Sequence, residues 1–425
     1  MNLSPFLAAC GAAADVHLTH FLCVTPVGIA AQYAAPPYRM DTLRLCYSMT
    51  KSFTSLAVGI AWGQGLLALD DLIGDILPDC MPEDRGHPAW EIRVRDLLTM
   101  SGGIGENTYS ALFGEPDWVK AYLHQDFPHP PGGVYLYSTH GSHVLSALVE
   151  RVSGQSLEDF LNRYLFHPMG IFEAQWERAP EGRIAGGMGL SLYPASLAKI
   201  AQMLLNSGAY GGQQLLPAAY LDLAAAVQIK KQGHDPEAVY GGDGYGFQFH
   251  IGKHEHYRMD GAFGQICLIC PQKRLAFVAL SSGSKTESLL RLIYTHFLED
   301  APPFSAGIYR MEENPMHIRT LALSGDWEDG TLTLQTDTGV QTLRFRLNGE
   351  TCGRTVFIKD LQTHEQTYVC RAAWRDGLEL TVHYIETPYI AVHRLSFLEN
   401  AVRLDFQINV SFTLKDFAAV GILCT

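Results

Sequence analysis

Residues 47–65 read YSMTKSFTSLAVGIAWGQG, and the rest of the chain is organised around this stretch. After Lys51, apolar residues recur at the i, i+3, i+4 spacing of one buried helix face, at Phe53, Leu56, Ala57, Ile60 and Ala61. On a helix that starts near Ser48, residues three positions apart lie on the same face. The Ser48 hydroxyl is therefore expected beside the Lys51 ammonium at the helix N-terminus.

Ser48 and Lys51 have the chemistry of a nucleophile with its activator. A serine hydroxyl is a poor nucleophile unless a neighbouring base takes its proton. A lysine at the edge of an apolar helix is desolvated, which lowers its pKa towards the range of a useful base. A helix cap followed by a solvated lysine is the simpler interpretation of the same spacing, so the pair needs support from the rest of the sequence.

Length and composition narrow the class of protein. The chain has 425 residues, which predicts two or three domains. An apolar content of 47% and a charged content of 18% are typical of a globular protein with a large interior. The net charge of −13 argues against a nucleic-acid partner. The uncharged run 52–69 is nearly long enough to span a bilayer, but Gly63-Gln64-Gly65 interrupts it, so no membrane insertion is expected.

The cysteine pattern favours a reducing compartment. Nine cysteines are scattered from Cys10 to Cys424, an odd and unclustered set that favours buried free thiols. Cys267 and Cys270 form a lone C-x-x-C pair in an apolar, strand-like run, where zinc would need a second pair, so both are expected in the core. Because the stretch before Cys10 lacks the positive region of a signal peptide, a cytoplasmic location is expected, with a periplasmic or surface location left open.

The clearest domain boundary runs from Ala301-Pro302-Pro303 to Asn314-Pro315. Before it, helical patterns alternate with strands, which predicts a domain of the α/β (α+β) class over residues 1–300. Beyond a linker at 301–317 the hydrophobic period changes to two, which predicts an antiparallel β domain over 318–425 that closes into a barrel or lipocalin-like half-barrel. Hairpin turns are expected at Asn348-Gly349, Asp376-Gly377 and Glu399-Asn400.

Two stretches between these elements are further candidates for a site. Residues 130–139, PPGGVYLYST, deliver an extended segment from a Pro/Gly turn, and an amphipathic helix follows. The glycine-rich loop 186–189 lacks the context of a dinucleotide fingerprint, so it is expected to pack tightly near a cleft.

Three motifs, in order and in spacing, make residues 20–300 resemble the serine β-lactamase and penicillin-binding-protein superfamily. Ser48-x-x-Lys51 looks like the first motif. Tyr137-Ser138-Thr139 is similar to the Tyr-x-Asn second motif, with Thr in place of Asn. Met259-Asp260-Gly261 occupies the place of the third, Lys-Thr-Gly. The flanks Leu97–Gly102 and Gly261–Gln265 support the match, in particular to class C-like esterases and D-aminopeptidases. The run Tyr137–Gly154 also looks like that of 6-aminohexanoate-dimer hydrolases.

The resemblance implies a transpeptidase-like antiparallel sheet flanked by helices and a role for each matching residue. Ser48 would attack a carbonyl and form an acyl-enzyme, while Lys51 and Tyr137 would share its proton, and which of the two is the base stays open. The backbone N–H groups of Ser48 and Ala262 would form the oxyanion hole. Substrate contacts would come from Thr139, Met259, Asp260 and Gly261. No metal and no cofactor is implied. The nearby histidines are expected to be ordinary polar positions: His140, His143, His250, His254 and His256.

Two departures from the family pattern bear on the substrate. In β-lactamases the third-motif lysine helps recognise a substrate carboxylate, and Met259 carries no charge. Thr139 lacks the amide donor of Asn. Both changes favour a small neutral ester, amide or peptide as the partner of a serine hydrolase. The alternatives are a true β-lactamase or DD-peptidase, and a non-catalytic binding or sensing protein that retains the fold. The β domain is expected to be accessory, and the sequence does not predict an oligomeric state.

Overall fold

The computed structural model describes residues 3–232, 242, 244–252, 256–283, 286–298, 304–359, 361–374 and 377–424. Of the residues singled out above, His254, Asp376 and 301–303 lie outside these ranges. The chain divides into two compact units, one of residues 13–291 and one that joins residues 2–12 to 292–425. Each unit has its own hydrophobic core.

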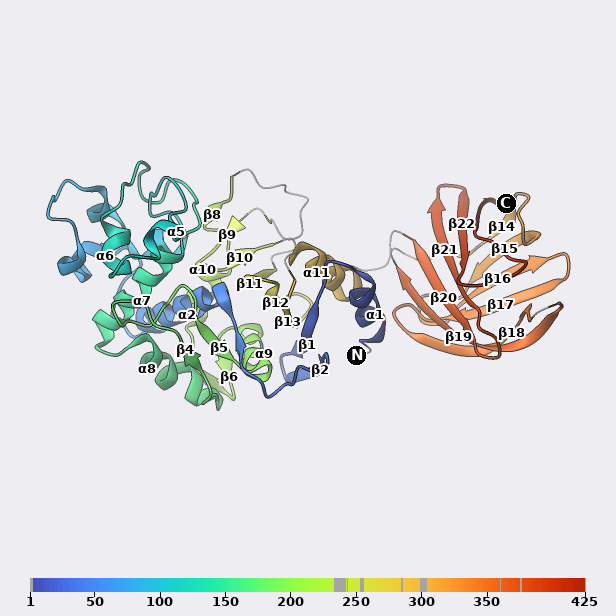
Figure 1. Ribbon diagram of the computed structural model, residues 1–425, viewed down its shortest axis with the longest axis horizontal. Helices are drawn as coiled ribbons and strands as arrows, with labels where there is room; N and C mark the ends of the chain where they lie inside the picture. The colour runs from blue at the N-terminus through green and yellow to red at the C-terminus, as the bar shows by residue number, and fades with distance from the viewer. Residues whose placement is uncertain are drawn as a thin grey trace. The chain divides into compact units, whose positions relative to one another are not determined.

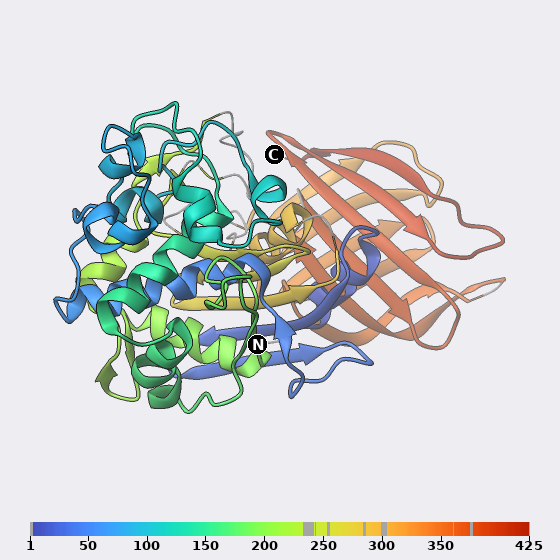
Figure 2. The ribbon, with the colours of Figure 1, turned by 60° about the vertical axis from the view of Figure 1, so that its left-hand side comes forward.

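The first unit is built on an eight-stranded sheet in the order β2-β1-β13-β12-β11-β10-β9-β8, in which every neighbouring pair is antiparallel (Figures 1 and 2). Every residue of β12 is buried, so this part of the sheet is covered on both faces. Helix α9 (Pro194–Leu205) packs on β1, β12 and β13. The strand bounds are β1 (Leu18–Thr25), β2 (Gly28–Ala34), β8 (Ile229–Lys230), β9 (Gly244–Tyr245), β10 (His250–Ile251), β11 (Tyr257–Gly261), β12 (Gln265–Cys270) and β13 (Leu275–Ser281).

Helix α2 (Thr50–Gly63) is buried on every side for almost its whole length, whereas its periodicity predicts one buried face. Its polar residues explain the difference, because they find partners inside the protein. The hydroxyls of Thr54 and Ser55 donate to the carbonyls of Gly186 and Phe247, at 2.6 and 2.7 Å. A buried hydroxyl without such a bond would cost about 1–3 kcal/mol. Helix α2 therefore lies fully inside the unit, next to α7 (Thr139–Ser153).

The two cysteines of the C-x-x-C pair belong to the core of this unit. The C-x-x-C pair lies on β12 with both side chains fully buried, and burial raises the pKa of both thiols, so the core assignment of Cys267 and Cys270 is confirmed. All nine cysteines are free thiols.

The remaining helices and strands of this unit are α3 (Ile73–Ile76), α4 (Val94–Leu98), α5 (Tyr109–Leu112), α6 (Trp118–Leu123), α8 (Leu157–Leu161), α10 (Ala218–Ala224), β3 (Arg44–Leu45), β4 (Gln175–Trp176), β5 (Leu190–Leu192), β6 (Ala209–Tyr210) and β7 (Gln213–Gln214).

A ten-stranded antiparallel barrel makes up most of the second unit, in the order β17-β16-β15-β14-β23-β22-β21-β20-β19-β18 (orange to red in Figure 1). Alternate side chains of its strands point into one core, as the period of two predicts. Its first strand, β14, lies inside residues 301–317, which were expected to be a linker. The strand is short and has prolines on either side, so its sequence is typical of a linker. The other elements of this unit and of the preceding segment are α1 (Ser4–Ala12), α11 (Thr286–Ile293), β14 (Gly307–Met311), β15 (Ile318–Ser324), β16 (Gly330–Thr336), β17 (Gly339–Phe345), β18 (Glu350–Ile358), β19 (Thr363–Trp374), β20 (Leu378–Tyr384), β21 (Ile390–Leu398), β22 (Ala401–Ile408) and β23 (Phe417–Leu423).

The barrel is nearly closed, and its seam lies between β17 and β18. The turn at Asn348-Gly349 was expected to make a hairpin, but the two strands that it joins are the opposite ends of the strand order. Side chains join them instead of a backbone ladder. The Thr342 N–H donates to Thr355 Oγ1 at 2.9 Å, and Thr351 Oγ1 donates to the Arg344 carbonyl oxygen at 2.6 Å. The hairpin prediction was wrong because a turn signal specifies the reversal of the chain and not the pairing of its flanks.

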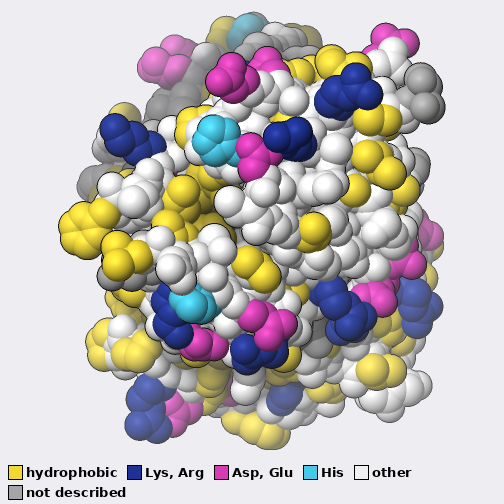
Figure 3. Space-filling view, turned by 90° about the vertical axis from the view of Figure 1, so that its right-hand side faces the viewer, with side chains coloured by type: hydrophobic (Ala, Val, Ile, Leu, Met, Phe, Trp, Pro, Cys, Tyr) yellow, Lys and Arg dark blue, Asp and Glu magenta, His cyan; other side chains and the backbone are white. Residues whose placement is uncertain are grey.

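The surface carries both signs of charge. Figure 3 shows basic and acidic side chains interspersed with hydrophobic ones on one face of the molecule. Within the described ranges, no helix combines the length and the apolar character needed to cross a membrane.

Candidate active site

Ser48 lies in the short 3₁₀ turn η1 (Tyr47–Met49), directly before helix α2. Tyr47 takes a φ of +50°, a left-handed conformation that is uncommon for a residue with a side chain. Together with the first turn of α2, this bend leaves Ser48 Oγ 2.8 Å from Lys51 Nζ. The contact that the Ser-x-x-Lys spacing predicts is thus confirmed.

Lys51 is a buried amine with two oxygen partners. Its side chain is 1% exposed, and Nζ also lies 2.7 Å from the Gly187 carbonyl oxygen. Burial lowers the pKa of Lys51 to about 7, because the charged form loses its hydration. Near neutral pH this amine can therefore accept a proton from Ser48 as well as return one.

The glycine-rich loop that carries Gly187 packs tightly, as expected. A Cβ on Gly187 would lie 2.4 Å from the Thr139 carbonyl oxygen, and a Cβ on Gly186 would lie 2.5 Å from Ser146 Cβ. Both contacts are with helix α7. Only glycine lets this backbone approach α7 closely enough to present its carbonyl to Lys51.

Tyr137 reaches the same place from the segment that leads into α7. Helix α7 begins at Thr139, and Ser138 caps it by accepting the Gly141 N–H at 3.0 Å. Lys51 Nζ lies 4.9 Å from the centre of the Tyr137 ring. The structure therefore brings together the three residues predicted to be catalytic, and it places Thr139, two residues after Tyr137, at the first position of α7.

The turn between β11 and β12 lies against the chain that enters Ser48. A Cβ on Gly261 would lie 2.2 Å from the Cys46 carbonyl oxygen, so only glycine allows this approach. Gln265 braces the turn, because its Nε2 donates to the carbonyls of Ala262 and Phe263 at 3.2 and 3.1 Å. Ala262 itself is exposed. Its main chain therefore lies beside the turn that carries Ser48, where an oxyanion donor would be needed.

The third-motif strand places Met259 and Asp260 on opposite faces of the sheet. The Met259 side chain is fully buried in the core of the unit, so only its main chain is left to contact a substrate. Asp260 is 9% exposed, and both of its carboxylate oxygens accept from Arg258 Nε, at 3.0 and 3.1 Å. The charge of this carboxylate is therefore partly compensated within the protein.

The histidines near the motifs fall into two groups. His140, His143 and His256 are buried, and burial lowers the pKa of His140 to about 4. His250 is partly exposed, and its ring centre lies 6.3 Å from that of Tyr137. His250 therefore contacts a candidate catalytic residue through its ring.

His143 and Glu181 lie 2.6 Å apart and support the glycine loop, and this pair was not predicted from the sequence. His143 Nδ1 accepts the Gly186 N–H at 3.4 Å, and Ser146 Oγ lies 3.5 Å from the same nitrogen. This Ser-His-Glu arrangement has the contacts of a catalytic triad. However, Ser146 is 2% exposed and donates to a backbone carbonyl, so no substrate reaches it. No local pattern predicts the pair, because its members lie 38 residues apart.

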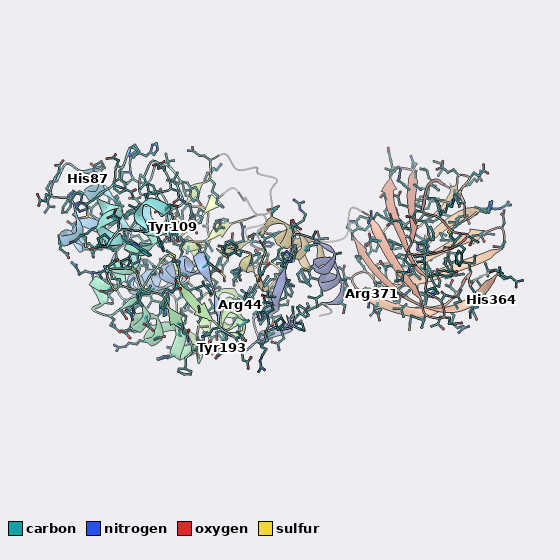
Figure 4. All side chains as sticks on the ribbon, viewed as in Figure 1. Arg44, His87, Tyr109, Tyr193, His364 and Arg371 are labelled. Atoms are coloured by element: carbon teal, nitrogen blue, oxygen red, sulfur yellow. The ribbon has the colours of Figure 1, made fainter. Side chains whose placement is uncertain are left out.

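Two exposed aromatic rings flank the Ser48 region. Tyr109 on α5, labelled in Figure 4, is 37% exposed and donates to Met188 Sδ at 3.6 Å, next to Gly187. Phe263 is 54% exposed, and its ring centre lies 5.1 Å from that of Tyr47. The surroundings of Ser48 thus offer apolar surface to a bound molecule.

Parts of this chain are similar in sequence to curated proteins. Esterase EstB from Burkholderia gladioli is 28% identical over 177 residues, which cover 37% of this chain and 44% of that protein. Penicillin-binding protein 4 from Amycolatopsis lactamdurans is 30% identical over 182 residues, which cover 40% of this chain and 47% of that protein. The matches thus span less than half the length of these curated relatives.

The similarity in fold and the match to the family model cover more of this chain than the matches to these relatives do. The octameric penicillin-binding protein homologue from Pyrococcus abyssi has a similar fold, with a TM-score of 0.57 and 16% identity, over 98% of this chain and 99% of that chain. The family model described as Beta-lactamase matches residues 11–298, more than half of the chain. The chain therefore belongs to the beta-lactamase family, within the superfamily of serine β-lactamases and penicillin-binding proteins.

Proposed function

We propose that this protein is a serine hydrolase that forms an acyl-enzyme on Ser48 from a small neutral ester, amide or peptide. The observation that carries the proposal is the 2.8 Å contact between Ser48 Oγ and the buried Lys51 Nζ. A lysine in that position is useful as a base because burial brings its pKa to about 7.

The reaction follows from the residues around Ser48. Ser48 Oγ attacks the substrate carbonyl carbon, and its proton passes to Lys51 or Tyr137. The negative oxygen that forms accepts from the N–H groups of Ser48 and Ala262, each of which is worth about 3–4 kcal/mol in such a site. The leaving alcohol or amine takes the proton as its bond to the carbonyl breaks. Water then attacks the acyl-enzyme by the same route and frees Ser48.

A neutral, apolar ester suits the charges around the site. The cations nearest to the third-motif strand among the described residues, Arg258 and Lys231, are 1% and 9% exposed, so they are not offered to a substrate carboxylate. The exposed rings of Tyr109 and Phe263 favour an apolar acyl or leaving group.

We expect a short p-nitrophenyl ester to be hydrolysed with a kcat/KM at least about 100-fold above that of a chromogenic cephalosporin, which carries a carboxylate. The measurement is the initial rate of both substrates with the same enzyme preparation. Ser48→Ala serves as the background control. Equal or faster turnover of the cephalosporin would contradict the neutral-substrate proposal and would favour the β-lactamase alternative.

The pH profile should report Lys51. Lys51 accepts a proton only when it is neutral, so kcat/KM for the ester should rise about tenfold per pH unit below about 7 and level off above it. The measurement is kcat/KM between pH 5 and 9, corrected for the spontaneous hydrolysis of the ester. A profile that is flat from pH 5 to 8 would show that no group with the pKa of Lys51 has to lose a proton.

A further inference from the structure

Four polar side chains form a cluster in the part of the eight-stranded sheet that runs from β11 to the edge strand β8. Lys231 directly follows β8, His250 lies on β10, and Arg258 and Asp260 lie on β11. His250 is the register partner of Arg258 on one side and of Tyr245 on the other. Directly paired residues share one face of a sheet, and so do residues two apart on a strand. The cluster therefore lies on the face opposite Met259.

The cluster is held together by short contacts. Lys231 Nζ lies 3.0 Å from His250 Nδ1, and Arg258 Nε donates to both oxygens of Asp260. His250 Nε2 lies 3.9 Å from Asp260 Oδ2. Among the described residues the cluster thus combines two cations with one carboxylate. Its members other than His250 are at most 9% exposed, so their charges act through a medium less polar than water.

The contact between Lys231 and His250 defines the state of the imidazole. Burial lowers the pKa of Lys231 to about 8, so at pH 7 it is still mainly an ammonium. An ammonium can only donate, so His250 Nδ1 accepts and the ring proton lies on Nε2, on the side of Asp260. His250 is then held with Nδ1 towards the Lys231 ammonium, which carries the positive charge of this contact.

Tyr137 lies next to this pair. Its ring centre is 6.3 Å from that of His250, with 33° between the ring planes, while Lys51 Nζ lies 4.9 Å from the same tyrosine ring. The Tyr245 ring contacts His250 edge-on at 5.0 Å and limits its movement. Tyr137 therefore contacts Lys51 on α2 directly, and it is linked to Lys231 through the His250 ring that Lys231 contacts.

We propose that Lys231, seated on His250, is a positioning residue that stabilises the phenolate form of Tyr137 during proton transfer. A nearby positive charge favours the ionised form of a phenol. The buried Met259 supplies no charge from the third motif, and Lys231 supplies one from a different strand. Since Lys231 is buried and contacts His250, it acts on Tyr137 through this contact and not on the substrate. This inference rests on the proposed role of Tyr137.

The test compares Lys231→Met with Lys230→Met, the same change at the neighbouring exposed lysine. Two p-nitrophenyl esters with acyl chains of equal length, one ending in a methyl group and one in a carboxylate, provide the substrates. We expect Lys231→Met to lower kcat about 10- to 100-fold for both esters, with KM changed by less than about twofold. Lys230→Met should leave both constants unchanged. Lys231→Arg should recover most of kcat, because it restores the charge.

Repeating the Lys231→Met substitution in the Tyr137→Phe variant separates a positioning role of Lys231 from a structural one. If Lys231 acts through Tyr137, Lys231→Met should cost less than about twofold when Tyr137 is already Phe, measured as the rate of labelling by a fluorophosphonate probe. His250→Phe, which keeps a ring but removes the acceptor of Lys231, should reproduce the loss if Lys231→Met does not fold.

Three results would overturn the inference. These are an equal loss from Lys231→Met in both backgrounds, a loss confined to KM for the carboxylate ester, and an unchanged kcat. Each of them leaves the proposed function standing as long as Ser48→Ala is inactive. Full activity of Ser48→Ala would instead reject the proposed function itself.

Discussion

Replacing Lys51 by methionine is expected to lower kcat/KM for a p-nitrophenyl ester by about 10³- to 10⁴-fold with little change in the melting temperature. The activity falls because Ser48 loses the amine that exchanges its proton, a role worth factors of this size in related proton transfers. The melting temperature should change little because methionine fills the space of the lysine stem and removes a buried charge, which offsets the lost hydrogen bond to the Gly187 carbonyl. Initial rates and thermal unfolding check both parts. Lys120→Met, at an exposed position on α6, is the matched control.

The double variant with Tyr137→Phe tells whether the two residues act in one step. Tyr137→Phe alone should also lose most of the activity, since both residues lie around the same proton. Residues that act as a unit combine far less than multiplicatively, so the double variant should be only a little slower than the worse single variant. Strictly multiplicative losses would mean that Lys51 and Tyr137 serve independent steps.

The parts of the site that lie on one local pattern could be predicted from the sequence. Ser48 and Lys51 are three residues apart on a helix, so their contact follows from helical geometry. The alternation of apolar residues predicts the barrel strands for the same reason, because it depends on local geometry alone.

Long-range partners could not be predicted in this way. The second acceptor of Lys51 is the Gly187 carbonyl, 136 residues away, and Lys231 meets His250 from a different strand. On β11 the alternation of apolar and charged residues predicts one exposed face, but all of its residues are buried, because neighbouring strands supply partners for the charged face. The seam of the barrel depends on hydroxyl side chains such as Thr355, whose partner is decided only when the barrel closes.

Ser48→Ala is expected to have the largest effect of any single change, a loss of at least about 10⁴-fold in ester hydrolysis. The substitution removes the only atom that the proposed acyl-enzyme is formed on. Because Ser48 is small and partly exposed, its removal should change the melting temperature little. Ser110→Ala, at an exposed position on α5, is the matched control and should keep full activity.

The central claim is that Ser48 is the nucleophile, and labelling with a fluorophosphonate probe tests it most directly. Intact-mass measurement followed by peptide mapping should find one adduct per chain of the wild-type protein, on the peptide that contains Ser48. The adduct should persist in Ser110→Ala and disappear in Ser48→Ala. An adduct that survives in Ser48→Ala would contradict the claim, and a wild-type protein that takes no label and cleaves no ester would favour a non-catalytic binding protein with this fold.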